Sequence, residues 1–322
     1  MRAALYESTG PARDVLSVRE VAIPEPGAGQ VRVRVEVSGI NPTDVKSRAG
    51  VAPRPFDGFQ IPHHDAAGVI DAVGEGVDPA RVGQRVWLYM AAATRSWGTA
   101  AEWTVLAEHQ AVPLPDAAAA GLGVCLGVPA MTAHHCLFSD GPLTGRTVLV
   151  AGGAGAVGHY AVELAAWSGA TVVATASGPE KAESARRAGA AHVVNYRDPD
   201  AAAQIRRAVS EVDRVIEVDL GANLGLDLAV LRQGGTVVSY ATGAKDATLP
   251  MRACMTANVA LRFMLLYTVA PEAVRTAAEG VALAVADGAL TALPLHHYPL
   301  DRVAEAHEAV EAGVTGKVVI DL

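Results

Sequence analysis

The chain has 322 residues and a formal net charge of −8 with no long basic run, which argues against a surface that binds nucleic acid. Its length predicts two domains whose cores need no disulfide or metal, and its charge suits a small neutral or hydrophobic partner better. Although 51% of the residues are hydrophobic, the apolar runs are shorter than the ~20 residues of a membrane span and the first residues resemble no signal peptide. We therefore expect no membrane insertion and a cytoplasmic location.

The first part of the chain, to about residue 112, has the pattern of an antiparallel β-domain. Short β-rich runs at 30–40, 66–74 and 83–89 alternate with Pro/Gly turns, and helix signals are sparse. This pattern is typical of a partly open antiparallel barrel.

The middle of the chain, from about residue 120 to 270, alternates strands with amphipathic helices. The predicted strands lie at 147–152, 171–176, 192–196, 214–219, 236–241 and 261–267. This alternation is typical of a doubly wound parallel sheet, so the predicted fold class is α/β. A helix at 271–288 and a last strand at 317–322 follow. We expect that strand to pair back into the first domain, because a final strand needs a partner sheet.

A glycine-rich loop connects the first strand of this sheet to the next helix. Gly153, Gly155 and Gly158 form the G-x-G-x-x-G pattern, in which the backbone approaches a pyrophosphate and the helix N-terminus supplies partial positive charge. The alternative is a glycine-rich turn without a ligand. Strand, loop, helix and second strand follow in the order of a dinucleotide site, so we predict that a dinucleotide binds here.

The end of the second strand indicates which dinucleotide binds. An NAD site usually has an acidic residue about 20 residues after the loop, and this chain has Ala176 and Ser177 there. Ser177 can donate a hydrogen bond to a ribose 2′-phosphate, and Lys181 can place a positive charge near it. The pattern therefore favours NADPH. Alternatively, Ser177 caps the helix that begins near Pro179 and Lys181 lies in solvent.

Eight segments carry a resemblance to a known family over essentially the whole chain. They are 38–50 (SGINPTDVKSRAG), 61–77, 82–87, 98–103, 127–135 (GVPAMTAHH), 151–158, 176–196 and 316–322 (GKVVIDL). In this order they resemble the zinc-free quinone oxidoreductase (zeta-crystallin-like) branch of the medium-chain dehydrogenases/reductases. The resemblance implies a GroES-like catalytic domain at 1–120 and 271–322, a Rossmann NADPH-binding domain at 121–270, a cofactor cleft between them, and a homodimer joined through an edge strand such as 261–267.

The residues at the positions of the zinc ligands differ from those of the zinc alcohol dehydrogenases. Those enzymes need two thiolates and an imidazole, whereas this chain has Asn41 and a residue near Val128 at the thiolate positions, and only His64 at the imidazole position. Cys125 is close enough to Val128 that a shifted alignment would restore one ligand. The stretch 89–103 also lacks the cysteines of the structural zinc lobe. We expect no metal.

Asn41, Asp44 and His64 are the candidate catalytic residues. The Asn41 amide can donate a hydrogen bond to an oxygen without a tuned pKa, although an Asn-Pro turn explains it equally well. Asp44 is four residues from Arg48, and the two can form an ordinary helical ion pair. His64 follows His63 in a segment that faces the cofactor in relatives, but solvated loop histidines are the simpler interpretation.

The remaining predicted contacts come from strand ends and from the resemblance. Backbone groups at 240–243 end a strand of the parallel sheet, where ligands gather. Phe263 and Leu265 are expected to form an apolar wall, with core packing or a dimer seam as alternatives. By resemblance, Lys181 and Tyr196 lie near the 2′-phosphate and Thr132 near the nicotinamide ribose or diphosphate. The predicted cofactor contacts are Asn41, Thr132, Gly153, Gly155, Ala156, Val157, Gly158, Ser177, Lys181, Tyr196, Tyr240, Ala241, Gly243, Phe263, Leu265 and Lys317.

The predicted activity is reduction by NADPH through direct hydride transfer. Without a metal to stabilise an alkoxide, the acceptor must yield a delocalised anion that hydrogen bonds can stabilise, as quinones and conjugated carbonyls do. Reduction of enones or enoyl thioesters is the alternative activity. A structural or regulatory protein that binds NADPH with little turnover is the alternative from another class, because binding and catalysis use different residues.

Overall fold

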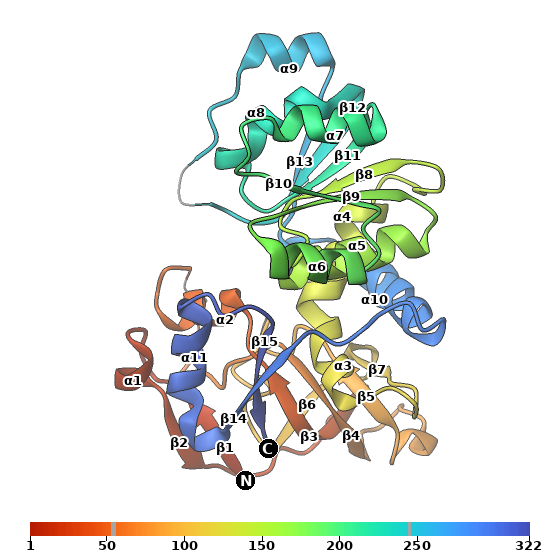
Figure 1. Cartoon of the computed structure of the whole chain (residues 1–322). Helices are drawn as coiled ribbons and strands as arrows, with labels where there is room; N and C mark the ends of the chain where they lie inside the picture. Colours follow the sequence, from red (N-terminus) through yellow and green to blue (C-terminus); the bar gives the residue numbers. More distant parts are fainter. Residues whose placement is uncertain (53–55, 244–245) are drawn as a thin grey trace. The chain divides into compact units, whose positions relative to one another are not determined.

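The computed structural model describes residues 1–52, 56–243 and 246–322 and divides the chain into two compact units (Figure 1). The first unit is Met1–Val128 with Ala292–Leu322, and the second is Pro129–Thr291. The first boundary lies at residue 128, against an expected 120. The second lies beyond the expected 270, because helix α10 (Pro271–Ala286) packs against α4 (Met131–Phe138) in the second unit. Gly280 permits this packing: a Cβ atom there would lie 2.0 Å from His134 Nε2.

The first unit contains the predicted antiparallel sheet. Its strands are β3 (Gln30–Gly39), β4 (Asp65–Val73), β5 (Arg85–Leu88), β6 (Trp103–Ala107), β7 (Ala111–Pro113), β14 (Leu295–Pro299) and β15 (Lys317–Asp321). The order is β14-β15-β3-β4-β5-β7, and β6 pairs with the first half of β3 while β15 pairs with its end. A strand shared in this way gives the partly open barrel that the sequence predicts. The last strand pairs back into this sheet, as expected.

Short helices and a two-stranded sheet complete the first unit. They are β1 (Arg2–Leu5), β2 (Ser17–Glu20), α1 (Ala12–Val15), α2 (Pro42–Arg48), α3 (Ala120–Cys125) and α11 (Val303–Glu311). Helix α2 begins after Asn41 with proline as its first residue, where the missing N–H costs nothing. Helix α11 contacts α1 and α2, so the two ends of the chain lie in one unit (Figure 1).

The second unit contains the predicted parallel sheet. The strands are β8 (Thr147–Val150), β9 (Thr171–Ala176), β10 (His192–Asn195), β11 (Val212–Glu217), β12 (Leu231–Ser239) and β13 (Ala260–Phe263), in the order β10-β9-β8-β11-β12-β13. The chain leaves β8 in one direction through β9 and β10 and returns to β11 on its other side. Ligands of such sheets bind beside this switch point, at the carboxyl ends of the strands.

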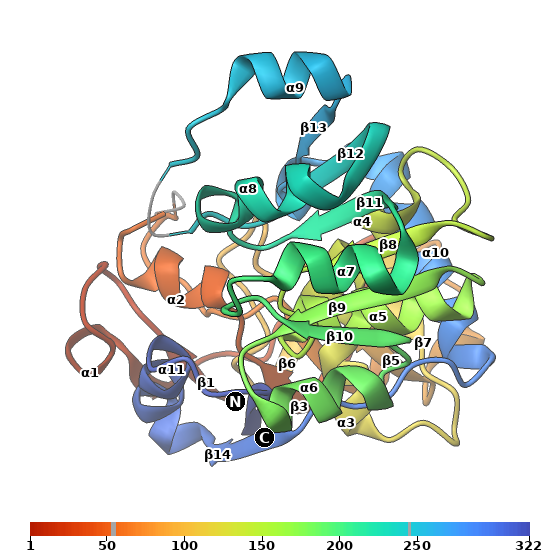
Figure 2. The same cartoon turned by 45° about the horizontal axis from the view of Figure 1, so that its top comes forward.

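The helices that connect these strands cover both faces of the sheet (Figure 1). They are α5 (Ala156–Trp167), α6 (Pro179–Arg187), α7 (Ala201–Val209), α8 (Leu220–Val230) and α9 (Met251–Ala257). Helix α9 and strand β13 lie at the edge of the sheet opposite β10 (Figure 2).

One helical stretch of the described residues, Ala120–Phe138, is as long and as apolar as a membrane span. It consists of α3, a π-helical turn at Leu126–Ala130 and α4. Within its most apolar window 83% of the residues are buried, and burial inside a protein core requires the same apolar composition.

Candidate functional site

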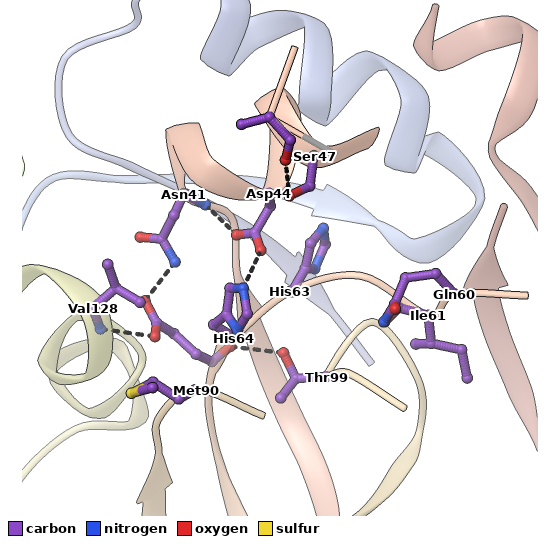
Figure 3. Close-up of polar contacts among 12 residues, drawn as sticks. Asn41, Asp44, Ser47, Gln60, Ile61, His63, His64, Met90, Thr99 and Val128 are labelled. Carbon is purple, nitrogen blue, oxygen red and sulfur yellow. Dashed lines mark hydrogen bonds and ion pairs between the residues drawn. The ribbon is translucent and has the colours of Figure 1, made fainter. Parts of the chain in front are cut away.

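A buried polar cluster, formed by Asn41, Asp65 and Lys317, lies where α2 and β4 begin. Lys317 Nζ is 2.7 Å from Asn41 Oδ1 and 2.8 Å from Asp65 Oδ2, and Asn41 Nδ2 donates to the same carboxylate oxygen at 2.8 Å. The other oxygen, Asp65 Oδ1, accepts a hydrogen bond from Val128 N at 2.8 Å (Figure 3). At most 3% of each side chain of this cluster is exposed. The carboxylate and the ammonium are thus paired and hydrogen-bonded, as buried charges require.

Two glycines make the space for this cluster. A Cβ atom at Gly127 would lie 2.2 Å from Asp65 Oδ1, and one at Gly39 would lie 2.6 Å from Lys317 Cε. Gly127 and Val128 belong to the π-helical turn, which also contains Pro129, a residue that disrupts regular α-helical hydrogen bonding. Both glycines belong to segments that carry the family resemblance, and the packing gives them a physical role.

The other two candidate catalytic residues border this cluster. Asp44 Oδ2 accepts the Asn41 N–H at 2.7 Å, the reciprocal bond of a helix capping box, and Asp44 Oδ1 lies 3.5 Å from His64 Nε2 (Figure 3). The interpretation of His64 as a solvated loop residue is wrong, because only 3% of it is exposed. Arg48, the expected ion-pair partner of Asp44, pairs with Glu311 and donates to the Gly10 carbonyl instead.

A chain of buried hydrogen bonds holds the backbone of Asp65. Thr99 Oγ1 donates to the Asp65 carbonyl at 2.9 Å, so Ser38, 2.8 Å away, must donate to Thr99 and accept from His63 Nδ1 at 2.9 Å. His63 Nε2 lies 3.0 Å from His307 Nε2. Because burial holds the pKa of His63 well below its ordinary value, His63 is neutral and His307 must be the donor.

The same chain explains an unusual backbone at His63. Its φ of 76° lies in the left-handed region, which costs energy for a residue other than glycine. Hydrogen bonds to both ring nitrogens keep it there. Burial, with the nearby Arg48 charge, lowers the pKa of His307 to about 3, so its Nδ1 carries no proton. Local sequence patterns do not predict this chain of hydrogen bonds, because its members are far apart in the sequence.

The glycine-rich loop in the second unit has the shape that close phosphate approach requires. A Cβ atom at Gly158 would lie 2.2 Å from the Gly152 carbonyl oxygen, and one at Gly153 would lie 2.7 Å from Ala174 Cβ. Gly155 is exposed and precedes the first turn of α5, with Ala156 and Val157 half-buried behind it. The backbone of this loop therefore fits a pyrophosphate at a helix N-terminus.

The residues predicted to bind the 2′-phosphate lie at the ends of two adjacent strands. Asn195 of β10 pairs with Ala176 of β9, so Tyr196 and Ser177 follow at the same edge of the sheet. The alternative that Ser177 caps α6 is wrong, because Gly178 is the N-cap residue and no side chain caps this helix. Lys181 is exposed, and the Arg197 guanidinium lies 5.6 Å from the centre of the Tyr196 ring. Arg197 is not among the residues that the sequence pattern predicts for this site. This edge can therefore attract an anion.

Two buried carboxyl groups lie at the end of β11 and in the helix that follows it, α8. Glu217 ends β11 and accepts a hydrogen bond from Asn223 Nδ2 at 2.8 Å. Burial raises the pKa of Glu217, and it raises that of Asp227 to about 9, with the neighbouring Glu217 carboxyl contributing. Neither residue is among the predicted site residues, although acidic residues in the apolar segment 212–230 indicate a buried acidic site.

The predicted nicotinamide contacts at 240–243 follow β12. Tyr240 N–H donates to the Glu217 carbonyl at 3.2 Å, and the Ala241 carbonyl accepts from Ser239 Oγ at 3.3 Å. A Cβ atom at Gly243 would lie 1.9 Å from Asp219 Oδ1, so the glycine lets the chain pass close to this carboxylate. These residues lie at the carboxyl ends of β11 and β12, where the switch-point rule places a ligand.

The remaining predicted contacts differ in exposure. Thr132 is buried within α4, whereas Phe263 is 72% and Leu265 is 50% exposed at and just after the edge strand β13. Of the two alternatives for the Phe263 segment, core packing is therefore wrong for this chain. An edge strand has unpaired backbone groups on one side, which can pair with another chain.

The donor set of the buried polar cluster does not suit zinc. The described residues contain no group of three or more His, Cys, Asp or Glu side chains that could hold a metal ion. At the positions that match the two thiolate ligands, Asn41 supplies an amide and Val128 a backbone N–H, neither of which is a soft ligand.

Comparisons with known proteins agree with this architecture. The family model of the alcohol dehydrogenase GroES-like domain matches residues 27–116, and that of the zinc-binding dehydrogenases matches residues 156–282. A quinone oxidoreductase from Homo sapiens is 31% identical over 327 residues, which cover 99% of this chain and 97% of the relative.

Two solved structures cover all of this chain and are themselves fully covered. An NAD-dependent alcohol dehydrogenase has a TM-score of 0.89, and a mycobacterial protein solved with NADPH has one of 0.84; each is 26% identical to this chain. The first of these proteins is NAD-dependent and the second is bound to NADPH, so the choice of cofactor for this chain depends on its own residues.

Proposed function

This chain belongs to the medium-chain dehydrogenase/reductase family as a quinone reductase-like oxidoreductase, and on that premise we propose that it reduces quinones with NADPH by direct hydride transfer without a metal. The observation that carries the proposal is the replacement of soft metal ligands by the Asn41–Asp65–Lys317 cluster. Hydride addition to a quinone gives a delocalised oxyanion, and hydrogen bonds from such a cluster can stabilise it.

The choice of NADPH rests on the strand ends of the second unit. Ser177 can donate to the 2′-phosphate, and Lys181 and Tyr196 lie on the same edge of the sheet without a carboxylate at the end of β9. The Gly153–Gly158 loop holds the pyrophosphate with backbone N–H groups, and residues 240–243 approach the nicotinamide. When bound, NADPH supplies the hydride.

In the first unit, Asn41 donates a hydrogen bond to the acceptor oxygen, where negative charge develops. Asp44 holds Asn41 through its backbone N–H and orients His64. The proton that completes the hydroquinone comes from water. The acceptor is a hydrophobic quinone, because a chain with a net charge of −8 and no long basic run suits a small uncharged partner.

The proposal includes a homodimer in the cytoplasm. The edge strand β13 leaves one side without a partner strand among the described residues and carries the exposed Phe263. Pairing of β13 with its counterpart in a second copy would cover this edge. Sedimentation analysis of the wild type and of Phe263→Asp tests this part, and a wild-type monomer contradicts it.

Stopped-flow oxidation of bound NADPH by a benzoquinone tests the activity. We expect a single-turnover transient, with NADPH oxidised in preference to NADH. The same preparation is then tested with an enone and an enoyl thioester. Oxidation by these acceptors alone would favour the enone reductase alternative. Tight binding of NADPH without oxidation by any acceptor would indicate a structural or regulatory protein.

A further inference from the structure

We propose that Lys317 is a positioning residue that fixes the orientation of the Asn41 amide, an inference that rests on the proposed function. The resemblance to the family assigns Lys317 to the cofactor, whereas the structure pairs its ammonium with Asn41 and Asp65. Only 2% of the residue is exposed. Its contacts therefore point to an action through Asn41 rather than on a ligand.

The contacts of Asn41 determine which way its amide faces. An ammonium has only donors, so the Asn41 atom 2.7 Å from Lys317 Nζ must be the carbonyl oxygen. A carboxylate has only acceptors, so the atom 2.8 Å from Asp65 Oδ2 must be the amide nitrogen. Rotating the amide by half a turn would place N–H against the ammonium and oxygen against oxygen. The pair of charges thus selects one of two orientations.

The selected orientation leaves a defined donor. Asn41 Nδ2 has two N–H groups, and among the described residues only Asp65 accepts one of them. The second N–H lies in the same amide plane, so the first hydrogen bond also determines its direction. It stays available for an oxygen of a bound molecule. If the amide could flip, it would present an acceptor there for part of the time and repel a developing oxyanion.

Packing alone does not explain a lysine at this position. Removing an ammonium from water is costly, and replacing buried ion pairs by apolar residues often leaves proteins as stable or more so. A methionine at position 317 would have a side chain of similar length, which could lie beside Gly39 as the methylene groups of Lys317 do. The charge is thus unnecessary to fill the space, but it adds to Asp65 a second contact that distinguishes oxygen from nitrogen in Asn41.

The partners of Asn41 are themselves held rigidly. Asp65 is fixed by Val128 N on its side chain and by Thr99 on its carbonyl, and Lys317 is the first residue of β15. Three parts of the chain that are distant in sequence therefore determine the plane of one amide. Such support from surrounding residues is what precise orientation of a reacting group requires.

The test compares Lys317→Met, Asn41→Ala and the double variant. We expect Lys317→Met to lower kcat with a benzoquinone on the order of 10-fold to 100-fold, with the Kd of NADPH nearly unchanged in a fluorescence titration. The double variant should lose no more than Asn41→Ala, because both substitutions remove the same interaction. In NMR spectra without NADPH, Lys317→Met should shift the side-chain amide signals of Asn41, identified by their loss in Asn41→Ala.

Other outcomes overturn the inference. A weaker Kd for NADPH with kcat retained would mean that Lys317 contacts the cofactor directly, and losses that multiply in the double variant would mean that the two residues act independently. If the wild type reduces neither quinones nor enones, the proposed function fails, and the amide signals alone decide: unmoved signals in Lys317→Met refute positioning.

Two further variants control for folding. If Lys317→Met does not fold, Lys317→Met combined with Asp65→Asn removes both charges of the buried pair together, and a loss of kcat at least as large is expected, because both contacts that orient Asn41 are changed. Arg13→Met removes one cation of an exposed ion pair with Glu308 in the same unit and should leave kcat, the NADPH Kd and the Asn41 signals unchanged.

Discussion

Replacing His307 with glutamine should make the stability of the protein less sensitive to acid. In the fold the pKa of His307 is about 3, against an ordinary 6.5, because burial disfavours its charged form. Between these values the unfolded chain binds one more proton than the fold at this residue, so stability falls as the pH falls below the ordinary pKa. Integrated from about pH 7 to about pH 5, the loss is about 2 kcal/mol.

Glutamine suits this test because its Nε2 can replace the donor to His63 while it does not titrate. Urea unfolding is followed by tryptophan fluorescence, since Trp87, Trp97 and Trp103 all lie in the first unit. From about pH 7 to about pH 5, the wild type should lose about 2 kcal/mol more free energy of unfolding than His307→Gln.

The absolute stability of the variant does not enter this comparison, which uses only the dependence on pH. His297→Gln is the matched control: it replaces an exposed histidine of the same unit and should keep the wild-type dependence. Equal losses in the wild type and in His307→Gln would refute the reasoning that His307 is buried in its neutral form.

Three further predictions concern the second unit. Lys181→Ala should weaken NADPH binding by about 1.5 kcal/mol, roughly tenfold, and leave the affinity for NADH nearly unchanged in fluorescence titrations. Equal effects on both cofactors would show that Lys181 does not contact the 2′-phosphate. Gly158→Ala should weaken both cofactors alike, because the added Cβ would lie 2.2 Å from the Gly152 carbonyl oxygen, and a crystal structure with an unmoved loop would contradict this. Asp227→Asn should stabilise the fold above about pH 7 by about 2–4 kcal/mol. The Asp227 carboxyl has a pKa of about 9 in the fold and an ordinary pKa of 3.8, so the wild-type fold loses stability as the pH rises between these two values. Urea unfolding measures this gain in the free energy of unfolding. A gain that decreases as the pH rises from about 5 to about 8 would contradict the predicted direction of the pH dependence.

Local patterns in the sequence predict much of the fold. Apolar runs separated by helical segments predict the parallel strands, and the structure has a strand, from β8 to β13, within or overlapping each predicted range. The Gly153–Gly158 loop follows from spacing alone, because only glycine permits the close approaches found at Gly153 and Gly158. These features depend on residues that are close together in the sequence, so the order and spacing of residues predict them directly.

The buried polar cluster could be predicted only in part. The residue type of Asn41 makes it a candidate, but the sequence predicts that its partner Lys317 contacts the cofactor and predicts no role for Asp65. A signal existed: Asp65 and Lys317 are single charges at the start of apolar strands, and buried charges require partners. The sequence alone could not say which charges meet, because β4 and β15 are not neighbours and both contact β3.

The sequence by itself determined the two kinds of sheet, the phosphate loop and the lack of thiolate ligands at positions 41 and 128, because each depends on the identity and spacing of nearby residues. Only the tertiary structure decided that His63 and His64 are buried, that α10 packs with α4, and that an ammonium faces Asn41. Burial and pairing of polar groups depend on segments far apart in the chain, and their free energy depends on how closely the whole fold brings those segments together.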